Sequence, residues 1–198
     1  MASLARPGGN ITGVVVRQLE LAAKRLELLK EALPRVTRVA VLWDSFSADQ
    51  VTETESASRS LRLQLQLVEL QDPPYDFAGA FKVAESGRAE AVLSSASPVL
   101  WRGRMRIAEQ ATKYRLPVIG PFREFAEAGA LLTYGVNLSE TYRHAALYVD
   151  KILRGSKPTD LPIERPTKFE LVINLKTAKA LGLTIPPSLL QRADHVIE

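Results

Sequence analysis

The sequence predicts an α/β protein, a three-layer α/β/α sandwich built on a mostly parallel sheet. Three observations predict it. Short apolar runs alternate along the chain with amphipathic segments of helical period. The run Arg38–Trp43 is apolar almost throughout, as strands are when both faces of a parallel sheet are covered. Strands that alternate with helices in this way form right-handed βαβ units, which place parallel strands in one sheet.

The first part of the chain is expected to form a helix, a strand, a second helix and a second strand. Residues 18–33 carry one apolar stripe at spacings of three and four, which Pro34 ends. The apolar run at 38–43 is the first strand, and the Ser- and Thr-rich residues 49–62 form a weaker helix. Residues 63–70 alternate with period two, which predicts a strand with one wetter face near an edge of the sheet.

The same alternation continues to the C-terminal end. Ser97 followed by Pro98 marks a helix start, because Ser caps helices and Pro suits the first helical position. Asn137 with Glu140 fits a capping box, and Asn174 caps a last short helix. The expected elements are a helix at 76–87, a strand at 89–94, a helix from 97 to about 114, a strand at 116–120, a helix at 122–128, a strand at 130–134, a helix at 137–154, a proline-rich connection at 156–167, a strand at 169–174, a helix at 174–182 and a tail at 185–198.

The composition excludes several classes of function. The 198 residues suit one large domain or two small ones, and 46% hydrophobic with 24% charged residues are ordinary globular values. The absence of cysteine excludes disulfides, cysteine-ligated zinc, iron–sulfur clusters and thiol catalysis. The net charge of +4 is dispersed. Its densest cluster, Arg102, Arg104 and Arg106, is interpreted as a solvated helix face, so no nucleic-acid partner is expected.

No arrangement of residues typical of an active site is found. Neither histidine, His144 or His195, follows a strand, and Ser94 lacks a Gly-x-Ser-x-Gly elbow, so a serine nucleophile with its base is not expected. Gly8-Gly9 does not belong to a phosphate loop, and the sequence holds no cluster of metal ligands. We therefore expect neither an enzyme nor a cofactor or metal site.

A binding site remains, at the carboxyl ends of the strands, where α/β sheets hold their ligands. Aromatic side chains with Ser and Asp neighbours follow successive strands there, and such residues line small-molecule pockets. The helix start at Ser97 and the guanidinium of Arg123 would bind a ligand carboxylate. Packing in the core or at the sheet edge is the alternative role of the aromatic side chains. The candidate ligand-binding residues are Trp43, Asp44, Ser95, Ser97, Phe122, Arg123 and Tyr134.

A series of short blocks covers nearly the whole chain, and the most specific of them is Pro166–Leu183. The other blocks are Arg6–Gly13, Leu21–Lys30, Arg38–Trp43, Ile107–Glu109, Leu116–Ile119, Phe122–Phe125, Glu127–Ala130, Thr133–Gly135 and Tyr148–Gly155. In this order the blocks resemble the substrate-binding proteins of a family of bacterial ABC transporters. That family includes tryptophan- and other aromatic-amino-acid-type binding proteins with a type 1 periplasmic-binding fold.

The resemblance implies two flavodoxin-like α/β lobes joined by three crossing strands, with the ligand in the cleft between them. Residues 14–134 and 169–198 would form the C-terminal lobe, and residues 1–13 and 135–168 would be remnants of the N-terminal lobe and of the crossovers. The implied function is to bind a small molecule, such as an amino acid, for an ABC permease in the membrane. The implied location of the full-length family is periplasmic or membrane-anchored and extracytoplasmic, whereas residues 1–10 show no signal-peptide pattern.

One position departs from the family pattern. After the strand at 89–94 the family often has an Asp-Pro step, whereas this chain has Ala96-Ser97-Pro98. A hydroxyl would then replace an acidic ligand contact, which leaves the type of ligand open.

The helix at 137–154 would lack its packing partner without the rest of the N-terminal lobe. An apolar stripe of this size is seldom left in water, so we expect a homodimer through this helix. The alternative function is accordingly a non-transport single-lobe sensor or an interaction and dimerisation module. The stripe consists of Tyr142, Ala145, Ala146, Val149, Ile152 and Leu153.

Overall fold

The computed structural model describes residues 3–16, 18–71 and 73–198. The chain forms two compact units and passes from one to the other three times. Unit 1 consists of Met1–Arg17 and Val136–Phe169, and unit 2 consists of Gln18–Gly135 and Glu170–Glu198.

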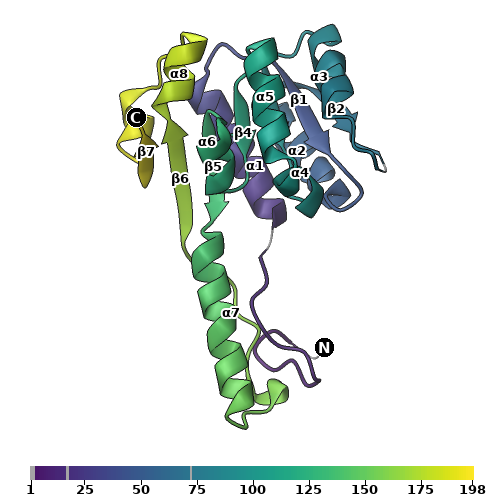
Figure 1. Cartoon of the computed structure of the whole chain (residues 1–198), viewed down its shortest axis with the longest axis vertical. Coiled ribbons are helices and arrows are strands. Elements are labelled where there is room, and N and C mark those ends of the chain that lie inside the picture. Colours follow the sequence, from purple (N-terminus) through teal and green to yellow (C-terminus); the bar gives the residue numbers. More distant parts are fainter. Residues whose placement is uncertain (1–2, 17, 72) are drawn as a thin grey trace. The chain divides into compact units, whose positions relative to one another are not determined.

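The sheet has seven strands in the order β2-β1-β3-β4-β5-β6-β7 (Figure 1). Strand β1 pairs in parallel with both β2 and β3, and the pairs β3–β4, β4–β5 and β6–β7 are parallel as well. The predicted fold class is therefore confirmed, and β2 lies at the edge, as its period-two pattern predicted. The strands are β1 (Arg38–Trp43), β2 (Gln64–Glu69), β3 (Ala91–Ser94), β4 (Val118–Gly120), β5 (Leu132–Val136), β6 (Phe169–Asn174) and β7 (His195–Ile197).

Helices cover both faces of the sheet. Helices α1 and α2 pack against each other on one face, and α3, α5 and α6 form a layer on the other (Figure 1). On the α1 face, Leu26 and Leu29 join Val41, Leu93 and Ile119 in one core cluster that excludes water. The helices of unit 2 are α1 (Gln18–Ala32), α2 (Ala48–Ser60), α3 (Phe77–Ser86), α4 (Pro98–Arg102), α5 (Arg104–Tyr114), α6 (Arg123–Ala128), α8 (Leu175–Leu181) and α9 (Pro187–Leu190).

The structure corrects two expectations about these elements. The single helix predicted from 97 to about 114 is two helices, α4 and α5, which meet at Gly103. A Cβ atom at Gly103 would lie 2.1 Å from the ring of Phe77, so the main chain there fits closely against α3. The tail from 185 onward also contains α9 and β7, which are too short to show a clear period.

Unit 1 is built around α7 (Leu138–Leu153), followed by the short 3-10 helix η1 (Pro158–Asp160). Asn137 caps α7 by accepting a hydrogen bond from the Glu140 N–H, as predicted. Tyr148 is buried and donates its hydroxyl to the Pro162 carbonyl at 2.8 Å. Burial, together with the carboxylate of Glu164, raises the pKa of Tyr148 to about 12.

The N-terminal segment completes unit 1. The Val15 N–H donates to the Glu164 carbonyl at 2.9 Å, and the Glu164 N–H donates to the Gly13 carbonyl at 2.9 Å. Thr12 adds a side-chain hydrogen bond to the Leu161 carbonyl at 2.7 Å. These bonds tie the N-terminal segment to the proline-rich connection that follows α7.

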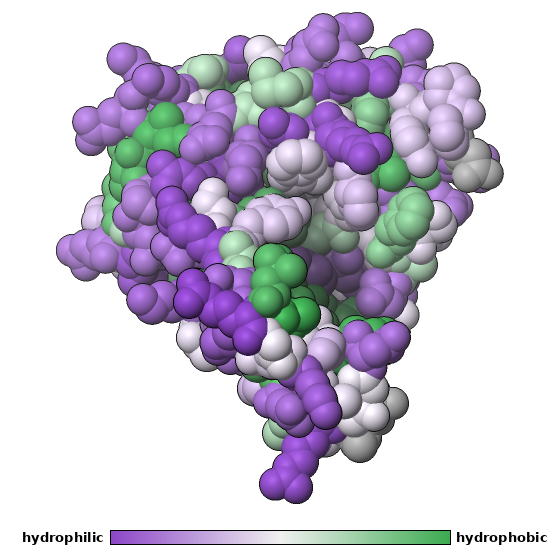
Figure 2. All heavy atoms as spheres, turned by 60° about the horizontal axis from the view of Figure 1, so that its bottom comes forward, coloured by the Kyte–Doolittle hydropathy of each residue, from purple (hydrophilic) through white to green (hydrophobic). Residues whose placement is uncertain are grey.

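The surface is largely polar. Figure 2 shows one face that is mostly hydrophilic, on which hydrophobic side chains emerge in separate groups. Among the described residues, the helices are too short or too polar to cross a membrane.

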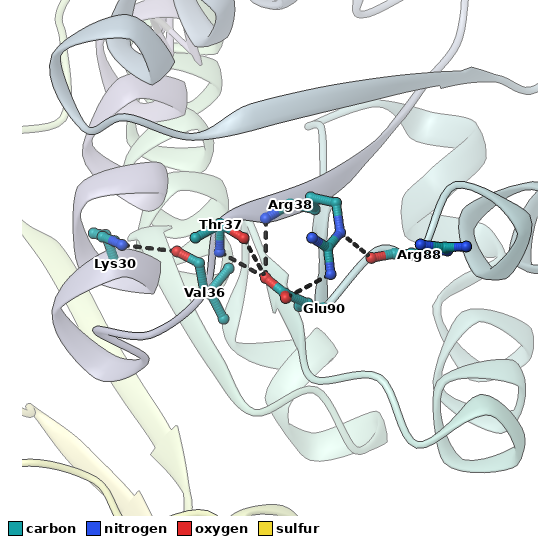
Figure 3. Close-up of polar contacts among 6 residues, drawn as sticks. All are labelled: Lys30, Val36, Thr37, Arg38, Arg88 and Glu90. Atoms are coloured by element: carbon teal, nitrogen blue, oxygen red, sulfur yellow. Dashed lines mark hydrogen bonds and ion pairs between the residues drawn. The ribbon is translucent and has the colours of Figure 1, made fainter.

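A carboxylate organises the amino ends of β1 and β3 (Figure 3). Glu90 Oε2 accepts hydrogen bonds from Thr37 N at 2.6 Å and from Arg38 N at 3.0 Å, and Oε1 accepts from Arg38 Nη2 at 2.7 Å. Arg38 Nε in turn donates to the Arg88 carbonyl at 2.7 Å. The Thr37 N–H is the main cause that lowers the pKa of Glu90 below its usual value.

Replacement of Glu90 by Gln should lower the free energy of unfolding by about 1 kcal/mol at pH 7, because the group is partly exposed and its hydrogen bonds are screened. A carboxyl whose pKa is depressed by folding stabilises the protein above its unfolded pKa, and this contribution disappears as the pH falls. The difference between wild type and Glu90→Gln should therefore vanish in acid. Urea unfolding of wild type and Glu90→Gln between pH 7 and pH 3 measures this difference in the free energy of unfolding. Glu85→Gln, an exposed carboxylate on α3, is the control, and an equal loss in both variants would contradict the assignment.

Candidate functional site

The carboxyl edge of the sheet has a point where the strand order reverses. From β1 the chain runs through α2 to β2 on one side, while β3, β4 and β5 follow on the other side. The connections after β1 and β3 therefore leave in opposite directions, and α/β sheets bind their ligands at such a point. Asp44 directly follows β1, and Ser95 and Ser97 directly follow β3.

Asp44 and Ser97 join the two connections by a direct, short hydrogen bond from the Ser97 hydroxyl to the Asp44 carboxylate. The other carboxylate oxygen of Asp44 accepts from Phe46 N and from Ser47 Oγ, both at 3.0 Å. The Asp44 side chain is only 2% exposed, so these three bonds replace its water shell. Ser97 also caps α4, because its hydroxyl accepts from Leu100 N at 3.0 Å, as predicted.

A side-chain amide provides a second link between the two connections. Gln50 on α2 donates Nε2 to the Ala96 carbonyl at 2.8 Å and accepts from Ala96 N at 2.9 Å. The buried Ser95 is held by its main chain, which donates to the Leu42 carbonyl at 3.0 Å. Trp43 is half-buried, and its indole Nε1 has no hydrogen-bond partner among the described residues.

Of the other three candidates, Phe122 and Arg123 follow β4, whereas Tyr134 lies within the neighbouring strand β5 and not after it, because this strand runs two residues further than predicted. Phe122 is largely buried before α6, and Arg123 on α6 donates Nε to Glu127 at 2.9 Å in a partly exposed ion pair. Tyr134 lies in β5, where its half-buried ring packs against the core on the α1 face. The ends of β4 and β5 approach closely, because a Cβ atom at Gly135 would lie 1.9 Å from the Pro121 carbonyl oxygen.

The seven candidates thus fall into two groups at one edge of the sheet. Asp44 and Ser97 are in direct contact, with Trp43 and Ser95 beside them in the chain. Phe122 and Arg123 follow β4 at the start of α6, and Tyr134 lies in the middle of β5. Whether they contact a ligand remains a prediction. The hydroxyl of Ser97, expected to face a ligand carboxylate, is already engaged with Asp44 and Leu100.

Arg25 was not among the predicted site residues, although it lies at the same edge. This α1 residue is completely buried, and its Nε donates to the Tyr134 carbonyl at 2.8 Å. Burial lowers the pKa of Arg25 to about 9. The sequence does hold a signal for it, because Arg25 is spaced by three and four from the buried residues Leu21, Leu28 and Leu29.

A family model described as ABC transporter substrate binding protein matches residues 1–197. The chain belongs to this family. The resemblance noted in the sequence is therefore confirmed. Members of the ABC transporter substrate-binding family are solute-binding proteins rather than a class of enzymes. The described residues contain no group of three His, Cys, Asp or Glu side chains suited to a metal ion.

A curated relative in this family is the tyrosine-binding protein of Clostridioides difficile (strain R20291), which is 20% identical over 182 residues. The alignment covers 91% of this chain and 52% of that protein, so the chain spans about half the length of this relative.

Solved structures of substrate-binding proteins share the fold. An ABC domain from Streptococcus pneumonia in complex with L-Trp is 26% identical, with a TM-score of 0.86 over 98% of this chain and 67% of that one. A conserved domain protein from Vibrio cholerae is 24% identical, with a TM-score of 0.87 over 98% and 65% of the two chains. A ligand-free, open substrate-binding protein with adhesive properties from Clostridium difficile is 20% identical, with a TM-score of 0.69 over 99% and 65%. At their lower identities, the last two matches support the fold alone.

Replacement of Ser97 by Ala should lower the free energy of unfolding by about 1–3 kcal/mol, because it removes a helix cap and a hydrogen bond to a buried carboxylate. Ser86→Ala, which removes an exposed hydroxyl on α3, should change it by less than about 0.5 kcal/mol. Urea unfolding of both variants measures the difference. Equal midpoints would show that the contact between Asp44 and Ser97 does not support the edge.

Proposed function

We propose that this protein is the solute-binding component of an ABC importer, and that it binds an amino acid at the carboxyl edge of the sheet in unit 2. The observation that carries the proposal is the family match over residues 1–197 together with the strand-order reversal beside Asp44 and Ser97. Aromatic amino acids are the favoured class, because the relative's name specifies tyrosine and the Streptococcus structure contains L-Trp. The partner that receives the solute would be an ABC permease in the membrane.

The contacts in unit 2 suggest distinct roles for the candidate residues. Trp43, Phe122 and Tyr134 would supply apolar and aromatic surface for the ligand side chain. Asp44 and Ser97 hold each other, so their role would be to shape the edge rather than to bind the ligand. Arg123 would bind the carboxylate, because its surface pair with Glu127 is weak and can be exchanged for a bidentate contact.

The proposal also covers the organisation of the chain. We interpret unit 2 as one lobe of a two-lobed clamp, and unit 1 as crossovers with a part of the other lobe. The three passages of the chain between the units support this interpretation. The chain spans 52% of the length of its curated relative, which is consistent with this interpretation.

A second candidate function is that of a dimerising interaction module, and the outer face of α7 favours it. This apolar face extends along the whole helix, with Tyr142 72%, Val149 56% and Leu153 81% exposed. A second copy of the chain suits it, because two α7 helices packed against each other would cover this apolar face with the same face of the partner.

Binding of an amino acid should stabilise the protein by about 2.7 kcal/mol at a concentration one hundred times the Kd, which raises the Tm by several degrees. L-Trp, L-Tyr and L-Phe are the ligands to test, with L-Ala as the control, by thermal shift and calorimetry. Arg123→Met should weaken the affinity about tenfold or more without lowering the Tm. Arg154→Met, which breaks the equivalent pair with Asp150 on α7, should leave the affinity unchanged. No shift with any of the three aromatic amino acids would refute the proposed ligand class.

Replacement of Val149 by Glu should convert a dimer into a monomer, because it places a charge in the centre of the apolar face. Leu147→Glu is the matched control, since Leu147 is 58% exposed on the opposite side of α7. Sedimentation equilibrium measures the mass of each variant. A wild-type mass that stays monomeric at every concentration would reject the dimer.

A further inference from the structure

Arg25 is a fully buried cation, and no carboxylate of the described residues pairs with it. The exposed fraction of Arg25 is 0%. Among the described residues, its guanidinium forms no ion pair and donates hydrogen bonds to one main-chain carbonyl and one side-chain amide oxygen. The third guanidinium nitrogen, Nη1, is buried and forms no hydrogen bond. Replacing a buried ionic group by an apolar one of similar size is often neutral or stabilising. The contribution of Arg25 to overall stability therefore does not account for its presence.

The two acceptors lie at two of the points where the chain passes between the units. Arg25 Nη2 donates to Gln18 Oε1 at 2.6 Å, and Gln18 is the first residue of unit 2 after the first passage. Arg25 Nε donates to the Tyr134 carbonyl at 2.8 Å, and Tyr134 is next to Gly135, the last residue before the second passage. These two acceptors are far apart in sequence, and one side chain of α1 holds both.

The geometry of the guanidinium explains how one arginine can hold both acceptors. Its nitrogens lie in one rigid plane, so the two acceptors are held at a set separation and angle. Gly135 fits this arrangement closely, since a Cβ atom there would lie 3.7 Å from Arg25 Nη2 in addition to its contact with the Pro121 carbonyl. The main chain at the end of β5 is thus enclosed between the guanidinium and the end of β4.

We propose that Arg25 is a positioning residue that ties the side chain of Gln18, at the start of α1, to the main chain at Tyr134, next to two of the points where the chain passes between the units. By holding the Tyr134 carbonyl it also sets the position of the Tyr134 side chain, one of the candidate ligand contacts. Only this last consequence rests on the proposed function. The fixing of the two chain segments can be measured in the protein without any ligand.

Hydrogen exchange of the full chain, followed by mass spectrometry, tests the proposal. In Arg25→Met, amides within 21–24, which are bonded to the carbonyls of the first turn of α1, and amides within 134–136 should exchange about tenfold faster or more. Those of β1 and β3 should be unchanged, and the Tm should stay within a few degrees of wild type. Lys24→Met removes the adjacent exposed cation of α1, which pairs with Glu27, and should change neither segment. Uniformly faster exchange with a lower Tm would show a purely structural role and overturn the proposal, as would unchanged exchange.

Two further variants keep the test decisive if Arg25→Met folds poorly. Arg25→Lys keeps a cation but not the planar fork, so it should restore protection at no more than one of the two segments. Full protection of both segments by lysine would show that charge alone suffices and would overturn the proposal. Gln18→Leu removes one acceptor only and should speed exchange at 21–24 but not at 134–136. Equal acceleration at both segments would contradict the assignment.

If Arg25 positions Tyr134, Arg25→Met should also weaken the binding of L-Trp more than it lowers the Tm. If wild-type protein binds none of the amino acids, the proposed function fails, yet the exchange experiment still decides the role of Arg25. If wild type binds L-Trp and Arg25→Met binds it equally well, the effect on Tyr134 is refuted while the proposed function stands.

Discussion

The hydrogen bond between Asp44 and Ser97 is the contact on which the carboxyl edge of the sheet depends. Because the strand order reverses between β1 and β3, the connections after these strands diverge, and the side chains of Asp44, Gln50 and Ser97 link them. A buried carboxylate is stable when its oxygens accept several hydrogen bonds, and Asp44 accepts three. The same hydroxyl of Ser97 begins α4. One pair of side chains therefore sets the loop after β1 and the helix after β3 together.

The two most buried charged side chains of the described residues differ in how their hydrogen bonds are satisfied. Asp44 has its hydrogen-bonding capacity largely filled by neighbours on its own side of the sheet and by Ser97. Arg25 has one nitrogen without a partner and gives its other bonds to residues at two passages of the chain. The first charge organises the candidate site directly. The second joins segments that are distant in sequence, the start of α1 and the strand β5.

Much of this fold follows from local patterns. The apolar run of β1 and the caps Ser97 and Asn174 were placed correctly, because each depends on a few adjacent residues. The break at Gly103 was missed. The ring of Phe77 approaches this glycine from another helix and leaves no room for a Cβ atom, a contact that the local sequence does not show. Residues of the candidate site were expected at strand ends, but the contact between Asp44 and Ser97 joins positions 53 residues apart and needed the strand order.

The cluster around Glu90 lies at the amino ends of the strands, opposite the candidate site. Surface positions beside it, such as the exposed Arg35, can therefore carry a probe that senses unfolding while remaining a full strand length from any bound solute. Since the chain contains no cysteine, one introduced at position 35 would be the sole thiol available for a fluorescent dye. The protein is thus suited to site-specific labelling with a dye that reports unfolding without occupying the candidate site.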